Sequence, residues 1–296
     1  MAAAEQLGYI PSDVGRSLAT RSTRQIALVA DIDNALYPRL VGPIHDALAL
    51  RGYRVVVVAE PGDHPDTHSR LLDRSVDAVI LTTVLRNSLL PDRLAARGLP
   101  FVQLNRVADR TDSDTVVADN KGGGRLVADL LLRMGHQHIA MILGPADASS
   151  SADREEGFLE RLGEDRLTVP PKWRMRRGFS HEDGRAAMGE LMSGATRPTA
   201  VFCVNDTTAV GALNAALALG TRVPEQVSVV GFDDLDFASW PCFELTTVHV
   251  DLTAMAIRAA ELILGRLGSG DSPFTHETIP VHLVERQTHG PAAASA

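Results

Sequence analysis

The sequence has 296 residues, of which 45% are hydrophobic and 22% charged, a composition typical of a globular protein with a large core. Its formal net charge of −8 excludes a basic nucleic-acid-binding surface over the whole chain, so any DNA contact has to be local. The N-terminus lacks the pattern of a signal peptide, and no apolar run approaches the ~20 residues that span a bilayer. We therefore expect a cytoplasmic protein without a membrane contact, with Cys203 and Cys242 as buried thiols.

Along the chain, short apolar runs alternate with helix-patterned segments. Residues 1–24 predict a short helix, Ser12–Ala19, before the first strand. Most predicted strands are continuous apolar runs, typical of parallel strands covered on both faces. These strands are Ile26–Ala30, Arg54–Ala59, Ala78–Leu81, Phe101–Leu104, Ile139–Leu143, Ala200–Val204 and Val227–Phe232. The predicted helices are Pro38–Arg51, Asp66–Arg74, Gly122–Met134, Asp153–Leu162, Glu182–Ser193, Asp206–Leu219 and Leu252–Leu267.

Alternating strands and helices predict an α/β fold of two doubly wound parallel-sheet lobes. Helix starts are predicted at Ser180, which has capping-box spacing to Asp183, and at Asp206. A ligand would bind where the carboxyl ends of both sets of strands face each other. The expected division is 1–24 for a hinge segment, 25–135 plus 250–275 for the N-terminal lobe, 136–249 plus 276–288 for the C-terminal lobe, and 289–296 for a disordered tail.

Several catalytic motifs are absent from the sequence. It has no GxxxxGK[ST] phosphate loop and no GxSxG nucleophile elbow. Gly122–Gly124 do not give GxGxxG spacing, because residue 127 is Val, and we interpret these glycines as allowing close packing at a helix start. His136 and His138 lack a cysteine or carboxylate partner in a metal-ligand pattern. We expect no enzyme activity, no cofactor and no metal site.

Polar and aromatic residues follow the predicted strands, where a cleft would lie. They include the loop from Asp31 to Tyr37, Asn105-Arg106, the stretch from Ser149 to Arg154, Asn205-Asp206 and Asp233-Asp234. Carboxylates and amides bind adjacent hydroxyls, and an aromatic face stacks on the C–H side of a sugar ring. Each residue also has a structural alternative, such as a helix cap at Asp206, a core aromatic at Tyr37 or a surface arginine at Arg154.

At this point the sequence resembles the lactose/galactose-repressor (LacI/GalR) family. The matching pieces include EQLGYIPSDVGRSLATRSTRQIALV, VADNKGGGRLVADLLLRMGHQHIAMILGP, AVFCVNDTTAVGAL and RVPEQVSVVGFDDLDFASW. The resemblance implies the type I periplasmic-binding-protein-like pair of lobes, preceded by Ser12–Ala19 as a hinge helix. Arg16 and Leu18 would contact DNA, with Leu18 as a minor-groove wedge. Effector contacts are implied for Tyr37, Ser150, Arg154, Phe179, Asn205 and Asp233.

The sequence departs from the family pattern in two places. Members begin with a helix-turn-helix, whereas here only the end of that headpiece is matched, so we expect an effector-binding core with its hinge. Ala35-Leu36 replace a common Pro-Phe pair, which leaves the identity of the effector open.

The expected function is that of an effector-responsive bacterial transcription regulator, a repressor, that binds a small sugar-like metabolite between its lobes. As a homodimer it would bind operator DNA when the helix-turn-helix is present. The alternatives are a sugar-binding receptor of a transport system, a sensor without DNA binding, and a Rossmann-type enzyme. The missing signal peptide disfavours the receptor, and the missing glycine motif disfavours the enzyme.

Overall fold

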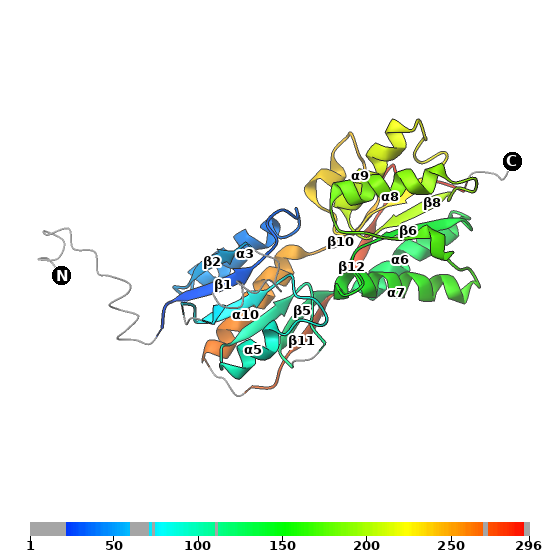
Figure 1. The fold of residues 1–296 in the computed structure, drawn as a ribbon. Coiled ribbons are helices and arrows are strands. Elements are labelled where there is room, and N and C mark those ends of the chain that lie inside the picture. The colour runs from blue at the N-terminus through cyan, green and yellow to red at the C-terminus, as the bar shows by residue number, and fades with distance from the viewer. Residues whose placement is uncertain (1–21, 60–70, 73–74, 110–111, 269–271, 293–296) are drawn as a thin grey trace, which may run out of the picture.

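A computed structural model describes residues 22–59, 71–72, 75–109, 112–268 and 272–292. These residues form two α/β lobes joined side by side (Figure 1). The predicted fold class is confirmed, since the sheet of each lobe is built from parallel strands. Within the described residues, no helix is long and apolar enough to cross a membrane. The predicted hinge helix, Ser12–Ala19, and most of the predicted helix Asp66–Arg74 lie outside the described residues.

The N-terminal lobe contains a parallel sheet with the strand order β11-β5-β4-β3-β1-β2. Every residue of β3 is buried, and alternate side chains enter different hydrophobic clusters: Ile80 lies in one cluster and Leu81 in the other. The sheet is therefore covered on both faces, as its apolar strands predict. The strands are β1 (Gln25–Val29), β2 (Arg54–Val58), β3 (Ala78–Leu81), β4 (Phe101–Leu104), β5 (Asp114–Ala118) and β11 (His276–Ile279).

The helices of this lobe lie on both faces of its sheet. Leu40 of α3 (Pro38–Ala49) and Met255 of α10 (Leu252–Gly268) belong to the cluster that contains Ile80. Leu94 of α5 (Leu90–Ala96) belongs to the cluster that contains Leu81. Helix α3 begins with a proline at its first turn, where the missing backbone N–H costs nothing.

The C-terminal lobe has a parallel sheet with the strand order β7-β6-β8-β9. Its strands are β6 (Ile139–Leu143), β7 (Arg174–Arg176), β8 (Ala200–Cys203) and β9 (Ser228–Val230). Its helices are α6 (Asn120–Arg133), α7 (Ser149–Glu164), α8 (His181–Ser193), α9 (Asp206–Ala218) and the 3-10 turns η1 (Pro171–Trp173) and η2 (Asp236–Ser239). The predicted capping box of Ser180 and Asp183 is confirmed at the start of α8.

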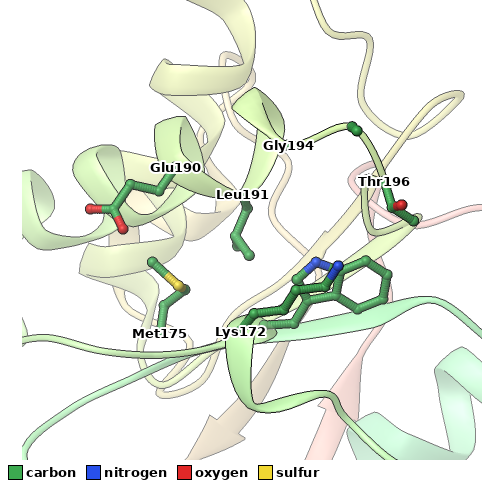
Figure 2. Close-up of a pocket in the computed structure, with 8 residues that line it drawn as sticks. Lys172, Met175, Glu190, Leu191, Gly194 and Thr196 are labelled. Carbon is green, nitrogen blue, oxygen red and sulfur yellow. The ribbon is translucent and has the colours of Figure 1, made fainter.

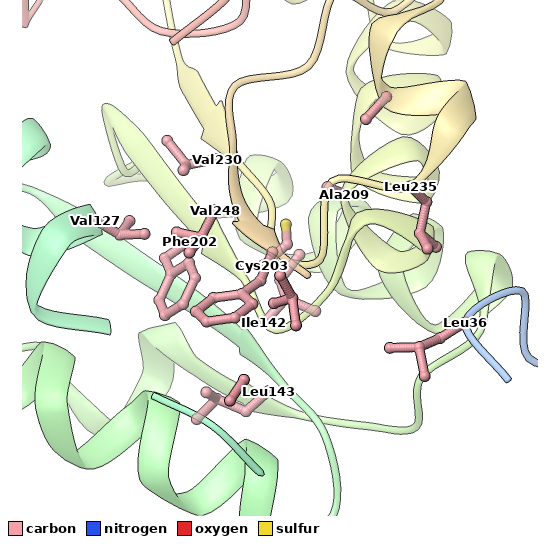
Figure 3. Close-up of a cluster of buried hydrophobic side chains, with 14 of the residues drawn as sticks. Leu36, Val127, Ile142, Leu143, Phe202, Cys203, Ala209, Val230, Leu235 and Val248 are labelled. Atoms are coloured by element: carbon pink, nitrogen blue, oxygen red, sulfur yellow. The ribbon is translucent and has the colours of Figure 1, made fainter. Parts of the chain in front are cut away.

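The core of this lobe is close-packed and includes one of the two cysteines. Phe202 and Cys203 of β8 lie among Ile142, Val127 and Val230 (Figure 3). Cys203 is buried, but Cys242 is exposed, so the prediction that both thiols are buried is wrong for Cys242. Leu36, from the loop after β1 of the N-terminal lobe, also belongs to this cluster and is labelled in Figure 3.

The chain crosses between the lobes at other points than we expected. Helix α6 packs on α7, and a Cβ at Gly124 would contact the Arg154 backbone, so 120–135 belongs to the C-terminal lobe. Strand β11 pairs with β5, so 276–279 belongs to the N-terminal sheet. Both lobe assignments were wrong for the same reason. The contacts that decide them join segments distant in sequence, and local sequence patterns do not predict such contacts.

An antiparallel pair of strands lies along two of the crossings. Strands β10 (Thr247–Val250) and β12 (Val281–Val284) pair with each other, and the bridge from Val230 to Thr246 joins β10 to the C-terminal sheet. Helix α10 follows β10 back into the N-terminal lobe, and β12 follows β11 out of it (Figure 1). The change of lobe predicted between residues 249 and 250 falls within β10.

The predicted disordered tail, 289–296, is wrong for its first residues. His136 Nε2 forms a hydrogen bond of 3.0 Å with the Gly290 carbonyl oxygen, and Gly290 N donates to Ser228 Oγ at 3.1 Å. The backbone N–H of Ala292 donates to the Met134 carbonyl oxygen at 2.8 Å. Residues 289–292 are thus bound to the C-terminal lobe, and His136 has a structural role there.

The glycines at the start of α6 allow close helix packing, as the sequence predicts. A Cβ at Gly124 would lie 2.2 Å from the Arg154 carbonyl oxygen, so α6 and α7 would have to move apart. We expect Gly124→Ala to lower the free energy of unfolding by about 1–3 kcal/mol. Gly163→Ala in α7 is the matched control, because a Cβ there would have no neighbour within 4 Å. Urea denaturation of both variants measures the difference, and equal stabilities would contradict the packing argument.

Candidate functional site

A small cavity lies between the two lobes and is lined by all the predicted effector-binding residues. Its volume is about 10 Å³, room for no more than one water molecule. The lobes are therefore closed over the site in this structure. The lining residues are Asn34, Leu36, Tyr37, Asn105, Arg106, Ser150, Arg154, Phe179, Asn205 and Asp233.

The ends of parallel strands bring these side chains together. Tyr37 follows β1 and Arg106 follows β4 in the N-terminal lobe. In the C-terminal lobe, Asn205 follows β8 and Asp233 follows β9, while Arg154 lies on α7 after β6. This is the crevice at the carboxyl ends of strands where α/β proteins bind ligands.

Arg154 is the most extensively bonded side chain of the cavity. Its Nε donates to Asn120 Oδ1 at 2.8 Å, its Nη1 to the Val204 carbonyl oxygen at 2.7 Å, and its Nη2 to Asp233 Oδ1 at 2.8 Å. Its guanidinium lies 3.7 Å from the ring centroid of Phe232. Both members of the ion pair are buried, with Arg154 4% exposed and Asp233 2%. Every nitrogen of the guanidinium is thus held in a fixed direction.

Asp233 lies beside this arginine and forms an isolated β-bridge with His249. Its backbone φ is +111°, a conformation that non-glycine residues rarely adopt. Burial raises the pKa of the Asp233 carboxyl, and the positive charges of Arg154 and Arg106 oppose part of that shift. The sequence places Arg154 and Asp233 in the C-terminal lobe and predicts that they face each other across the cleft. In the structure they instead bind each other directly.

Asn205, and not Asp206, caps helix α9. The Asn205 side chain accepts a hydrogen bond from Thr208 N at 2.9 Å and donates one to the Phe179 carbonyl oxygen at 3.3 Å. Asp206 is the first residue inside the helix and is fully buried. The prediction of Asp206 as the cap was one residue off, because both residues are good caps and only the backbone decides between them.

The buried carboxylate of Asp206 connects the start of α9 to the segments of Leu235 and Thr247 by hydrogen bonds. This carboxylate accepts hydrogen bonds from Leu235 N at 2.8 Å and from Thr247 Oγ1 at 2.5 Å. Desolvation by burial raises its pKa well above the usual value, an effect that the nearby negative charge of Asp233 increases. The folded protein therefore favours the protonated carboxyl.

The raised pKa of Asp206 stabilises the folded protein at low pH, and this stabilisation decreases as the pH rises. In the unfolded chain the Asp206 carboxyl ionises at about pH 3.9, so its contribution to the free energy of unfolding is fully present below that pH. The contribution is lost as the pH rises toward the pKa of the folded protein, at up to about 1.4 kcal/mol per pH unit. We expect Asp206→Asn to abolish it, so the melting temperature of the variant relative to the parent increases from pH 5 toward pH 8. Parallel pH profiles of the two proteins would contradict this prediction.

Tyr37 and Arg106 form the N-terminal wall of the cavity. Tyr37 is buried, its Oη accepts a hydrogen bond from Asn105 Nδ2 at 3.4 Å, and burial raises its pKa. The Arg106 guanidinium lies 4.5 Å from the Phe179 ring centroid, in the opposite lobe. Sequence reasoning noted Asn105-Arg106 after a strand but did not include Arg106 among the site residues. Its position after β4 was the available signal.

Further contacts across the cleft hold the lobes together. Ser149 Oγ at the start of α7 accepts a hydrogen bond from Val107 N at 2.9 Å, and Asp147 O accepts one from Arg86 N at 2.8 Å. At the rim, Arg39 and Asp236 form an exposed ion pair of 2.6 Å. Ser150, the next residue of α7, lines the cavity itself. Opening the cleft breaks this set of contacts.

A larger cavity of about 290 Å³ lies elsewhere, on one lobe only. Figure 2 shows it between the segment of Lys172 and Met175 and the end of α8, near Glu190 and Leu191. It contains none of the predicted site residues. Because ligands of this fold class bind where strand ends from both lobes meet, the smaller interlobe cavity is the candidate site. The predicted DNA-contacting residues, Arg16 and Leu18, lie outside the described residues.

Comparisons with known proteins agree with this architecture. A family model described as a periplasmic binding protein-like domain matches residues 128–289. The HTH-type transcriptional repressor PurR of Proteus mirabilis is 31% identical, over 97% of this chain and 86% of that protein. A complex of the transcriptional regulator CelR with cellobiose has a TM-score of 0.84 at 29% identity, covering 97% of this chain and 88% of the other.

A lac repressor dimer bound to operator and an anti-inducer has a TM-score of 0.86 at 26% identity, over 97% of this chain and 88% of that one. The matches cover both lobes, and the relatives are regulators of transcription. The chain therefore belongs to the LacI family of transcriptional regulators and carries the periplasmic-binding-protein-like domain of that family.

Proposed function

We propose that this chain is the effector-sensing part of a cytoplasmic transcriptional repressor that binds a small sugar-like metabolite between its lobes. One observation carries the proposal: the interlobe cavity is lined by Tyr37, Ser150, Arg154, Phe179, Asn205 and Asp233. Relatives of the chain include a repressor and a regulator in complex with cellobiose, which supports an effector of this general class.

Each side chain has a chemical role in this proposal. Asp233 accepts hydrogen bonds from ligand hydroxyls, while Arg154 holds its carboxylate in place. Phe179 provides a ring face for stacking, and Asn205 fixes the Phe179 backbone through its amide. Ser150 contributes a hydroxyl at the start of α7. The site binds and positions its ligand without chemical change.

Switching follows from the interlobe contacts. A ligand shifts the balance between open and closed lobes only by its difference in affinity for the two forms. Because the closed cavity holds about 10 Å³, a sugar-sized effector has to change the spacing of the lobes. Such a change would be transmitted to a hinge at Ser12–Ala19, with Arg16 on phosphates and Leu18 in the minor groove.

A thermal-shift screen of sugars, sugar derivatives and nucleosides tests the site directly. A ligand at about 100 times its dissociation constant adds about 2.7 kcal/mol of stability. Fluorescence anisotropy on DNA from upstream of the gene, with and without the hit, then tests regulation. A protein that no metabolite stabilises, or a hit that leaves DNA binding unchanged once a helix-turn-helix is present, would contradict the proposed function.

We also predict a homodimer, with the subunit contact beside the N-terminal lobe at Pro38–Arg51 and Asp66–Arg74. A two-fold pair of chains would place two hinge segments side by side for a pseudo-palindromic operator. Light scattering at micromolar concentration should give twice the 31.7 kDa of one chain. A monomer under these conditions would contradict the prediction.

A further inference from the structure

The effector cavity contains a buried arginine without a counter-ion. Arg106 is 8% exposed, and its Nε has no hydrogen-bond partner. Its guanidinium covers the ring of Phe179 at 4.5 Å and lies 5.9 Å from the ring centroid of Tyr37. Among the described residues, no carboxylate forms an ion pair with Arg106. A buried charge without a partner is costly, and contact with aromatic rings recovers only part of that cost.

The charge of the cavity is not balanced by its other lining residues. Arg154 and Asp233 neutralise each other in their ion pair, and every nitrogen of Arg154 is already bonded. With Arg106, Arg154 and Asp233 as its charged lining residues, the cavity has one positive charge more than negative charges. Buried polar groups are nearly always satisfied, so an unpaired donor in a binding site indicates a group that a ligand supplies.

A second feature of the same cavity favours an anion. Helix α7 begins at Ser149, no side chain caps its first N–H groups, and its first turn has no acidic residue. Ser150 in that turn lines the cavity. The N-terminus of a sixteen-residue helix presents backbone donors and the positive end of its dipole to whatever occupies the space.

We infer that the effector carries an anionic group, a phosphate ester or a carboxylate, which pairs with Arg106 at the start of α7. This inference rests on the proposed function and specifies the ligand class of the same site. Pairing with the anion draws the Arg106 guanidinium off Phe179. The exposed ring face then becomes available to the sugar ring, while Asp233 receives its hydroxyls. In this structure Arg106 thus occupies the place that the effector ring would take.

Binding of matched neutral and anionic probes tests the inference. The probes are glucose, glucose 6-phosphate, glucuronate, ribose, ribose 5-phosphate and inorganic phosphate, measured by thermal shift and calorimetry. At least one anionic probe should bind the parent protein at least tenfold more tightly than its neutral sugar, and Arg106→Gln should remove that preference. Comparing the phosphate esters with glucuronate identifies which anion the site takes.

Arg39→Gln is the matched control, because Arg39 lies at the rim of the same cleft in an exposed ion pair with Asp236. It should retain the preference for the anion. The unliganded Arg106→Gln variant should melt at or above the parent temperature, which shows that it folds.

Two results would overturn the inference. If a neutral sugar binds best and Arg106→Gln leaves its affinity unchanged, the ligand has no anionic group, although the effector site itself stands. If no anionic probe gives stabilisation that depends on Arg106, the inference fails as well. Failure of every metabolite in the wider screen, neutral or anionic, would instead contradict the proposed function.

Discussion

Replacing Arg154 by alanine should lower the free energy of unfolding by about 3–5 kcal/mol, because it leaves the Asp233 carboxylate buried without its partner. The substitution also removes hydrogen bonds to Asn120 and to the Val204 carbonyl oxygen, and the contact with the Phe232 ring. Urea denaturation measures the loss.

Arg161→Ala on the same helix is the control for Arg154→Ala. Arg161 pairs with Asp129 and Asp165 near the surface, so its removal should cost about 1 kcal/mol or less. Adding Asp233→Asn to Arg154→Ala removes the unpaired charge, so the double variant should lose less stability than the sum of the single variants. Additive losses would show that the ion pair does not couple the two residues.

Asp233→Asn alone should weaken binding of the best effector from the screen by about 10- to 150-fold, the loss of one charge-assisted hydrogen bond. Asparagine keeps an acceptor for Arg154 Nη2 and tolerates the backbone φ of +111° better than most residues, so the protein should stay folded. Calorimetry gives the affinity. Asp236→Asn at the exposed rim of the cleft is the control and should bind the effector as the parent does. Unchanged affinity in Asp233→Asn would remove Asp233 from the site.

Most of the sheet could be predicted from the sequence because its central strands are continuous apolar runs. β3, β4 and β6 have the predicted bounds. Five strands were missed: β5, β7, β10, β11 and β12. Of these, β7 reads RMR and β11 reads HETI with alternating exposure, both at a sheet edge, whereas β5 reads DTVVA inside the N-terminal sheet. Edge strands expose polar side chains, so their hydrophobic signal is weak.

The residues that line the interlobe cavity could be predicted because residues that follow parallel strands meet at one edge of a sheet, and because a family resemblance supported them. The pairing of Arg154 with Asp233 was missed, although the expected division placed both in the C-terminal lobe, because local sequence patterns do not specify which side chains bind each other. The unpaired Nε of Arg106 was missed for a similar reason. That its Nε lacks a partner can be recognised only once every neighbouring group has a position.

The division of the N-terminal lobe between two parts of the chain determines the order in which the protein can assemble on the ribosome. Strand β5 ends at Ala118, but its partner β11 begins only at His276, after the whole C-terminal sheet. At about 5–20 residues per second, the edge of β5 waits about 8–30 s for that partner. During this interval its unpaired backbone groups can join strands of other chains. The lobe whose first strands are synthesised first is thus the last to be completed.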